Sequence, residues 1–315
     1  MIKYIIKRLF YAFLTLLTLV TITFFMMRLL PGDPFIGEKV IPETTMKALN
    51  AKYGLDKPMW QQLLIYVGNV FRGDLGISMY YNNRSVNEII SLAFPYSFDL
   101  GIRALIFSVT IGVSLGIVAA VKRGTKWDTI SMLLAIIGVS VPSFIVGSLL
   151  QYFLGLRLFQ WTGLRIFPIT GWDSFSSTLL PAFALSFGSM ATISRLMRTS
   201  MLDVLGQDYI KTAKSKGLSQ KKVIWKHAVR NAIMPVITVL GPIAAFVLTG
   251  AFVVENIFSI PGMGKFFVNS IRVQDYTMIS GITLFFGAFL VIANLLVDLA
   301  YGFIDPRVKL SEAKE

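Results

Sequence analysis

Residues 100–121, LGIRALIFSVTIGVSLGIVAAV, contain a single charged side chain, that of Arg103. A helix of about 20 such residues crosses a hydrocarbon layer roughly 30 Å thick. Five further apolar runs have a comparable length. They are residues 9–30, 130–154, 179–196, 233–254 and 278–303. The pattern predicts an all-α polytopic membrane protein with six transmembrane helices.

The composition agrees with this class and argues against a soluble enzyme. Hydrophobic residues make up 55% of the 315 residues and charged residues only 15%, whereas about a quarter of the residues in a soluble domain are charged. The chain has no cysteine, and its one histidine is His227. Disulfides and thiolate metal sites are therefore excluded, and neither a metal centre nor a Ser-His-Asp triad is expected.

The net charge of +13 is distributed as in a membrane protein and not as in a nucleic-acid binder. Lys and Arg gather in connections between the apolar runs, above all in residues 122–128 and 195–230. Short cytoplasmic loops carry such an excess of positive charge. We therefore expect both termini to be cytoplasmic and no nucleic-acid partner.

The first apolar run is interpreted as a retained anchor, because it is too long for a signal peptide and lacks a small-residue cleavage site. Residues 31–96 mix charges, Gly and Pro with an amphipathic stretch at 59–71, which predicts a folded extracytoplasmic element. The expected division of the chain is an N-terminal transmembrane helix at 1–30, this segment at 31–96, a transmembrane domain of five helices at 97–304, and a cytoplasmic tail at 305–315.

The long basic loop, expected at residues 197–232, contains the most informative pattern. Asp208 can cap the start of a short helix, and Gly217 can end it in the left-handed conformation. Ile210 and Ala213 then fall on one face together with Tyr209 and Gly217, and lysines surround the rest. A second short helix follows Ser219. The alternative is a solvated basic loop that attracts anionic membrane lipid.

Polar and small residues inside the runs have two interpretations. Ser108, Gly112, Gly116 and Ala120 recur every four residues, which favours close helix packing over lining of a pore. Asp298, near the end of the last run, could serve as the proton-relay carboxylate of a secondary transporter, although a carboxylate that faces other helices near the membrane interface is more common.

Several motifs in the expected order resemble one family. The basic loop contains Lys211-Thr212-Ala213, then Lys216-Gly217, then His-Ala-Val-Arg-Asn-Ala at 227–232 and Pro235. Further motifs are residues 3–34, which end in Pro-Gly-Asp-Pro, YGLDKP at 53–58, GDLG at 73–76 and VENIFSIPGMG at 254–264. Together they resemble the first permease subunit of dipeptide and oligopeptide importers, a branch of the type I ABC importers. The loop departs from the general Glu-Ala-Ala pattern of that class at Lys211 and Thr212.

The resemblance implies a type I ABC permease fold in a bacterial cell membrane, and a subunit that catalyses no bond chemistry itself. ATP and Mg would be bound by two separate ABC ATPase subunits. This fits the sequence around residues 32–40, which lacks the Gly-Lys-Ser/Thr of a P-loop. The other implied partners are a second homologous permease and an extracytoplasmic peptide-binding protein. The implied residues for coupling to the ATPase are Lys211, Thr212, Ala213, Lys216, Gly217 and Leu218.

The last external loop could act as a gate over the translocation path. The residues expected there are Glu255, Asn256, Pro261, Gly262 and Gly264. Two alternative functions stay open at this point. One is an importer of nickel or a metal chelate, since permeases of that kind look similar at every motif above. The other is a proton-coupled secondary transporter, which the carboxylates of Asp298 and Glu255 would favour.

Overall fold

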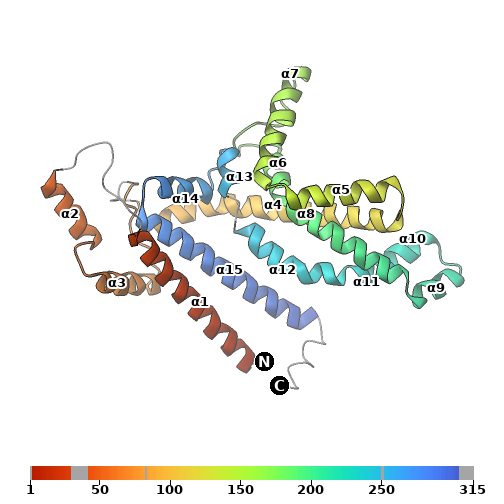
Figure 1. Cartoon of the computed structure of the whole chain (residues 1–315), viewed down its shortest axis with the longest axis horizontal. Coiled ribbons are helices and arrows are strands. Elements are labelled where there is room, and N and C mark those ends of the chain that lie inside the picture. Colours follow the sequence, from red (N-terminus) through yellow and green to blue (C-terminus); the bar gives the residue numbers. More distant parts are fainter. Residues whose placement is uncertain (1, 30–41, 82–83, 250–251, 305–315) are drawn as a thin grey trace. The chain divides into compact units, whose positions relative to one another are not determined.

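The structure, a computed structural model, describes residues 2–29, 42–81, 84–249 and 252–304, and for residues 2–5 and 297–304 it describes the backbone alone (Figure 1). Every named element in this part of the chain is a helix. The chain forms two compact units. The first comprises residues 1–96 and 261–295, and the second comprises residues 97–260 and 296–315.

In the described ranges, the first unit contains four whole helices and parts of two others. They are α1 (Ile2–Leu29), α2 (Glu43–Tyr53), α3 (Met59–Phe71), the start of α4 (Val86–Val121), α14 (Met263–Arg272) and most of α15 (Tyr276–Ile304). The boundary between the units within α4 lies one residue after Pro95. A proline inside a helix removes one backbone hydrogen bond and favours a kink at that point.

The second unit contains the remainder of α4 and the helices between it and residue 260. These are α5 (Lys126–Ser140), α6 (Ser143–Leu150), the π-helix η1 (Gln151–Arg157), α7 (Leu158–Thr162), α8 (Phe175–Leu205), α9 (Asp208–Ser215), α10 (Gln220–Lys222), the π-helix η2 (Val223–Val229), α11 (Arg230–Ala232), α12 (Met234–Leu248) and α13 (Phe252–Ile257).

Four helices in the described ranges are long and apolar enough to cross a membrane, and the number rises to six if each of two bent helix pairs is one span. The prediction of six transmembrane helices agrees with this result. The single helices are Ile6–Leu29, Val86–Val121, Phe175–Leu205 and Tyr276–Leu296, and the bent pairs are Lys126–Ser140 with Ser143–Thr162 and Gln220–Ala232 with Met234–Leu248.

The third predicted run, residues 130–154, is not one continuous helix. Its two parts meet at an angle of 111° across Val141 and Pro142. Proline cannot donate the next helical hydrogen bond, and its ring pushes the preceding residue out of the helical conformation. Val141 accordingly has extended backbone angles, φ −96° and ψ 122°.

Helix α8 is the centre of the second unit, where it packs against α5, α6 and α12. Close contact between helices depends on small residues. A methyl group placed on Gly116 of α4 would lie 2.6 Å from the Ser194 carbonyl oxygen of α8, and the Ser108 hydroxyl lies 2.7 Å from that of Ser189. The packing interpretation of the small-residue stripe is therefore confirmed.

A buried aspartate organises the first unit. Asp275 precedes α15, and its carboxylate accepts a hydrogen bond from the Met278 amide at 3.0 Å, as a helix cap does. The same carboxylate accepts from the hydroxyl of Ser78 and from the amides of Met79 and Tyr80, at 3.1 and 3.2 Å. Asp275 thus ties the loop before α4 to the start of α15.

Candidate coupling surface

Helix α9, the first predicted helix of the basic loop, is separated from the end of α8 by two residues. Residues 197–205, expected to belong to the loop, instead continue α8. The predicted cap at Asp208 is wrong, because Gln207 occupies the cap position and Asp208 is the first helical residue. The Asp208 carboxylate instead pairs with Lys211 Nζ at 2.8 Å. Both side chains are exposed, so this pair contributes little stability.

One face of α9 packs inside the chain's own core. Ile210 is completely buried and Ala213 is nearly so, in a cluster with Met197 and Met201 of α8 and Val223 of η2. Full burial of an isoleucine side chain is worth about 1.5–3 kcal/mol. Of the four residues predicted to share this face, only these two are buried. The small side chain of Ala213 therefore serves packing within the chain and leaves the outer face of α9 to other residues.

The end of α9 is a Schellman turn. The Gly217 amide donates to the Lys214 carbonyl at 2.9 Å, and the Leu218 amide donates to the Ala213 carbonyl at 3.4 Å, which are the two hydrogen bonds of that motif. Gly217 has a φ of +76°, so the predicted left-handed helix end is confirmed. Apart from its neighbours in the chain, no described residue has an atom within 4 Å of the position that its Cβ would occupy. The glycine is needed for its backbone conformation and not for space.

A second helical stretch, residues 220–232, follows Ser219 as predicted and consists of α10, η2 and α11. It is joined to α9 by the Asn231 side-chain amide, which donates to the Tyr209 hydroxyl at 2.9 Å. Trp225 is 64% exposed on its outside, and His227 is partly buried.

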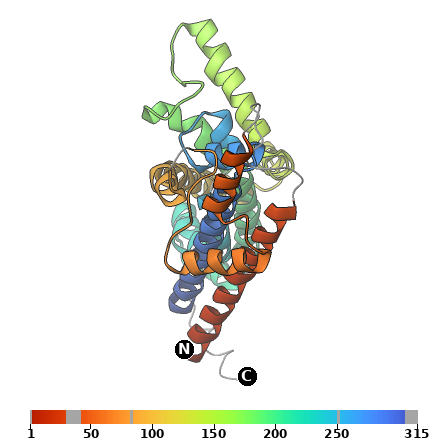
Figure 2. The same ribbon diagram turned by 90° about the vertical axis from the view of Figure 1, so that its left-hand side faces the viewer.

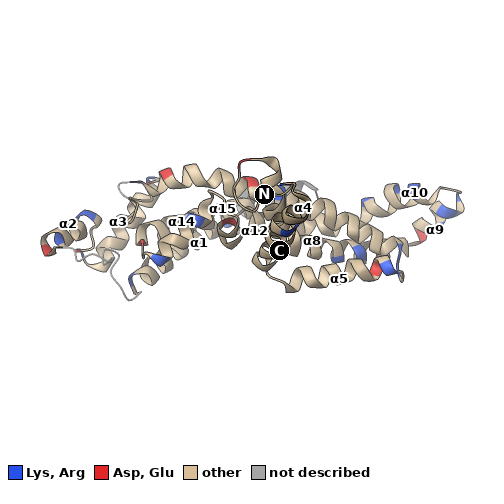
Figure 3. Cartoon of the chain, turned by 90° about the horizontal axis from the view of Figure 1, so that it is seen from above, with Lys and Arg blue, Asp and Glu red and all other residues tan. Residues whose placement is uncertain are grey.

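The outer faces of these helices form a basic surface, here called the coupling surface. Figure 3 shows the concentration of Lys on α9 and α10. The residues of the coupling surface are all exposed, and they are Lys211, Thr212, Lys214, Lys216, Gly217, Lys221, Lys222, Trp225 and Lys226. Leu218, a further predicted coupling residue, is partly buried against the core below. Its exposed Trp225 ring, on helices that pack against the core below, is of a residue type enriched where proteins contact one another.

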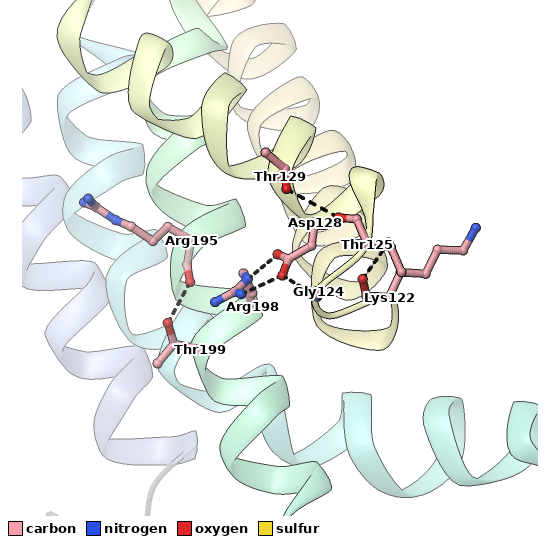
Figure 4. A network of polar contacts seen from close by, with 8 residues as sticks. All are labelled: Lys122, Gly124, Thr125, Asp128, Thr129, Arg195, Arg198 and Thr199. Atoms are coloured by element: carbon pink, nitrogen blue, oxygen red, sulfur yellow. Dashed lines mark hydrogen bonds and ion pairs between the residues drawn. The ribbon is translucent and has the colours of Figure 1, made fainter.

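An ion pair braces α8 just before the coupling surface (Figure 4). Arg198 Nε and Nη2 donate to the two carboxylate oxygens of Asp128 at 2.7 and 2.9 Å, and the Gly124 amide adds a third bond at 3.1 Å. The pair fixes the turn between α4 and α5 to α8. The sequence gives no signal for it, because the two residues lie 70 positions apart and only the fold brings them together.

The predicted gate residues fall in both units. Glu255 is completely buried in α13, and Asn256 beside it is exposed; both belong to the second unit. Pro261, Gly262 and Gly264 belong to the first unit, where Gly262 precedes α14 and Gly264 lies in its first turn. Asp298 lies in the part of α15 whose side chains are not described. The gate stays a prediction.

A glutamine that the sequence did not indicate holds the end of α13. The Gln151 side-chain amide donates to the Ile257 carbonyl at 3.0 Å and to the Ile169 carbonyl at 2.8 Å. The Gly171 amide donates to the Phe258 carbonyl at 2.9 Å. These bonds connect the segment after α13 to the loop before α8. Gln151 lies inside the apolar run 130–154. A single polar residue in such a run does not indicate which groups it will bind.

These features define a class, namely a polytopic helical membrane protein with a basic surface built on short helices between its spans. Comparison with known proteins makes the class specific. Residues 112–310 match the model of the family described as "Binding-protein-dependent transport system inner membrane component", and residues 1–101 match the model of its N-terminal region. The chain belongs to this family of transport-system membrane subunits.

Individual relatives match over nearly the whole chain. The dipeptide transport system permease protein DppB of Bacillus subtilis is 47% identical over 98% of this chain and 99% of its own length. The DppB protein of Lactococcus lactis is 44% identical over 98% of this chain and 100% of its own length. The oligopeptide transport system permease protein OppB of Haemophilus influenzae is 40% identical over 98% of this chain and 100% of its own length. Among solved structures, the MetNI methionine ABC transporter has a TM-score of 0.49 at 15% identity, with 69% of this chain and 94% of that chain covered.

Proposed function

We propose that the chain is a channel-forming permease subunit of an ATP-driven importer of dipeptides or oligopeptides. The observation that carries the proposal is the 47% identity to a dipeptide permease over 98% of the chain. The relatives reported above are named for dipeptide or oligopeptide transport, which favours peptides over nickel or a metal chelate.

The coupling surface supports a mechanical role for α9. In this proposal, two ABC ATPase subunits bind ATP and Mg, and one of them docks on the outer face of α9. The inner face is anchored by Ile210 and Ala213 against α8 and η2. A displacement imposed on α9 by closure of the ATPases therefore moves α8 with it, because packed helices shift as rigid bodies.

The remaining partners follow from the same proposal. A second homologous permease completes the channel, and an extracytoplasmic binding protein delivers the peptide. Both termini and the coupling surface face the cytoplasm of a bacterial cell, and residues 31–96 lie outside. Glu255, Asn256, Pro261, Gly262 and Gly264 contribute to an external gate, and alternating access moves the peptide.

The test is purification of the tagged chain in mild detergent, identification of the proteins that accompany it, and reconstitution of the whole assembly into liposomes. We expect two ATPase chains and a second permease, and uptake of labelled dipeptide or pentapeptide that requires ATP and is blocked by vanadate. Labelled Ni²⁺ serves as the competing substrate in a parallel measurement.

Three results would overturn the proposal. The first is uptake by the chain alone, driven by a proton gradient. The second is uptake of Ni²⁺ with no uptake of any peptide. The third is copurification without any nucleotide-binding chain.

A further inference from the structure

The first unit contains two cavities that lie along the same three helices. One, with a volume of about 340 Å³, has mixed walls in which Arg28, Lys52, Lys57 and Asp74 stand among apolar side chains. The other, about 320 Å³, is lined almost entirely by apolar side chains. Helices α1, α3 and α15 contribute to both. Figures 1 and 2 show α3 beside α1, as their contacts require.

Arg28 is the main cationic group of the polar cavity. Its guanidinium lies 3.7 Å from the centre of the Phe24 ring, and its Nε donates to Gln62 Oε1 at 2.7 Å. The Phe24 ring thus covers one face of the guanidinium, and Gln62 binds one of its edges. Its two terminal nitrogens donate no hydrogen bond to any described residue. A guanidinium held in this way presents a fork of donors that suits a phosphate or a carboxylate.

Other groups around the polar cavity also favour an anion. Among the described residues that line it, Lys52 and Lys57 accompany Arg28, against one carboxylate, that of Asp74. Asp74 already accepts the Gly76 amide at 2.8 Å. The charge of the walls is therefore positive in sum, although one acidic side chain is present.

Tyr66 adds a buried hydroxyl to the same cavity. The hydroxyl oxygen forms no hydrogen bond of normal geometry with the described residues. Burial raises the pKa of Tyr66 to about 12, although Arg28 and Ser280 act in the opposite direction. The group is consequently protonated at neutral pH, so it adds no negative charge beside Arg28.

The apolar cavity continues the polar one along the helices. On α1, Leu17 and Val20 line the apolar cavity, and Phe24 and Arg28 line the polar one. These residues are three or four positions apart, so they lie on one face of the helix. On α15, Ser280 lines the polar cavity and Leu284 and Ala288 the apolar one, with the same spacing.

Both helices place the polar cavity at one end of the apolar cavity. The residues that line the polar cavity come from the last part of α1 and from the first part of α15. Leu75 lines both cavities and marks the place where they meet. The combined shape is polar and cationic at one end and apolar at the other. Such a shape is too long for a free phosphate alone. It also does not suit a peptide, because its apolar part offers few hydrogen-bond partners to a peptide backbone.

We propose that this pair of cavities binds one anionic phospholipid, with the phosphate at Arg28 and an acyl chain between α1, α3 and α15. Under the orientation proposed above, the lipid belongs to the outer leaflet. This proposal does not depend on the transported substrate. It gives residues 42–81 a lipid-dependent attachment to the first transmembrane helix.

The experiment reconstitutes the full assembly in nanodiscs that contain equal amounts of phosphatidylglycerol and phosphatidylcholine, followed by native mass spectrometry of the lipids retained after release. We expect retained phosphatidylglycerol in the wild type. Arg28→Gln should reduce it about fivefold, as the loss of about 1 kcal/mol for one membrane-facing charge implies. Ala288→Trp should reduce it through the apolar cavity, independently of any charge.

Matched controls separate these effects from general damage. Arg72 is an exposed arginine in the same segment that does not line the cavity, and Ile292 is an exposed residue of α15. Arg72→Gln and Ile292→Trp should retain the lipid at the wild-type level. Equal retention in Arg28→Gln, in Ala288→Trp and in both controls would overturn the proposal.

Two further measurements identify other occupants. A photo-crosslinking residue at Phe71, which lines the apolar cavity and is 65% exposed, should yield a lipid adduct. An adduct to a protein chain instead would show that a partner subunit covers the cavity, and the lipid proposal would fail. It would also fail if inorganic phosphate displaced the bound anion completely and Ala288→Trp had no effect, because the site would then hold a free anion.

Discussion

Gly217 adopts a left-handed backbone conformation, which a side chain with a branched Cβ disfavours strongly. The cost for an ordinary residue is about 1–2 kcal/mol, and the turn at the end of α9 depends on it. We expect Gly217→Val to lower ATP-dependent peptide uptake, because a loss of that size shifts the equilibrium between the formed and the unformed turn about five- to thirtyfold toward the unformed turn. The measurement is initial uptake in liposomes, normalised to the amount of inserted chain.

Asparagine supplies the control at the same position, since it is the non-glycine residue that tolerates this conformation best. Gly217→Asn should retain most of the uptake, and both variants should insert into the membrane equally. Normal uptake by the valine variant would show that the turn at Gly217 is not needed for coupling.

The ion pair between Asp128 and Arg198 is the second residue-level feature that can be tested by substitution. Its side chains are 10% and 24% exposed, and hydrogen bonds to charged groups in such surroundings contribute about 1.5–3 kcal/mol. We expect Asp128→Asn and Arg198→Gln each to lower the apparent melting temperature of the detergent-solubilised assembly. The double variant should be no less stable than the worse single variant, because both changes remove one interaction.

The exposed pair Asp208–Lys211 provides a comparison. Its side chains are 94% and 69% exposed, and such pairs contribute about 0–1 kcal/mol. The same set of single and double changes there should leave the melting temperature nearly unaltered. Strictly additive losses at Asp128 and Arg198 would contradict the role assigned to their bond.

At the scale of helices, the contact between α4 and α8 depends on the missing side chain of Gly116. A methyl group there would approach the Met197 Cβ as well as the Ser194 carbonyl, each to 2.6 Å, so the helices would have to separate. Overpacking of this kind costs about 1–3 kcal/mol. We expect Gly116→Ala to lower the apparent melting temperature of the assembly.

Gly68 of α3 is the matched glycine, because in the described ranges no atom beyond its own turn of helix lies within 4 Å of the position that a Cβ would occupy there. Replacement of an open helical glycine by alanine is favourable by up to about 1 kcal/mol. Gly68→Ala should therefore be neutral or stabilising. If both variants melted at the wild-type temperature, close packing at Gly116 would not contribute to stability.

For the whole molecule, the topology is open to a direct test because the chain has no cysteine. Single cysteines placed at exposed Thr44 in α2 and exposed Ser215 in α9 should react with a membrane-impermeant maleimide from opposite sides. In intact cells, we expect labelling of Thr44→Cys and none of Ser215→Cys until the membrane is opened. The reverse pattern would invert the proposed orientation and place the coupling surface away from cytoplasmic ATP.

The sequence by itself determined the class of the protein, because a membrane imposes long apolar runs and uneven loop charge that need no tertiary information to recognise. It also predicted the left-handed end at Gly217 and the packing role of the small-residue stripe at Gly116, since both follow from local backbone and side-chain size. The motifs in the basic loop and the external loops indicated the family in the same way.

Only the tertiary structure decided which groups meet across the chain. The Asp128–Arg198 pair, the bonds of Gln151 and the bonds of Asp275 to the loop before α4 join residues that lie far apart in the sequence, and no local pattern encodes such a choice of partner. The structure also placed Ala213 inside the core and the lysines of α9 outside. Periodicity defines the faces of a helix, but the elements packed beside it determine which face is buried.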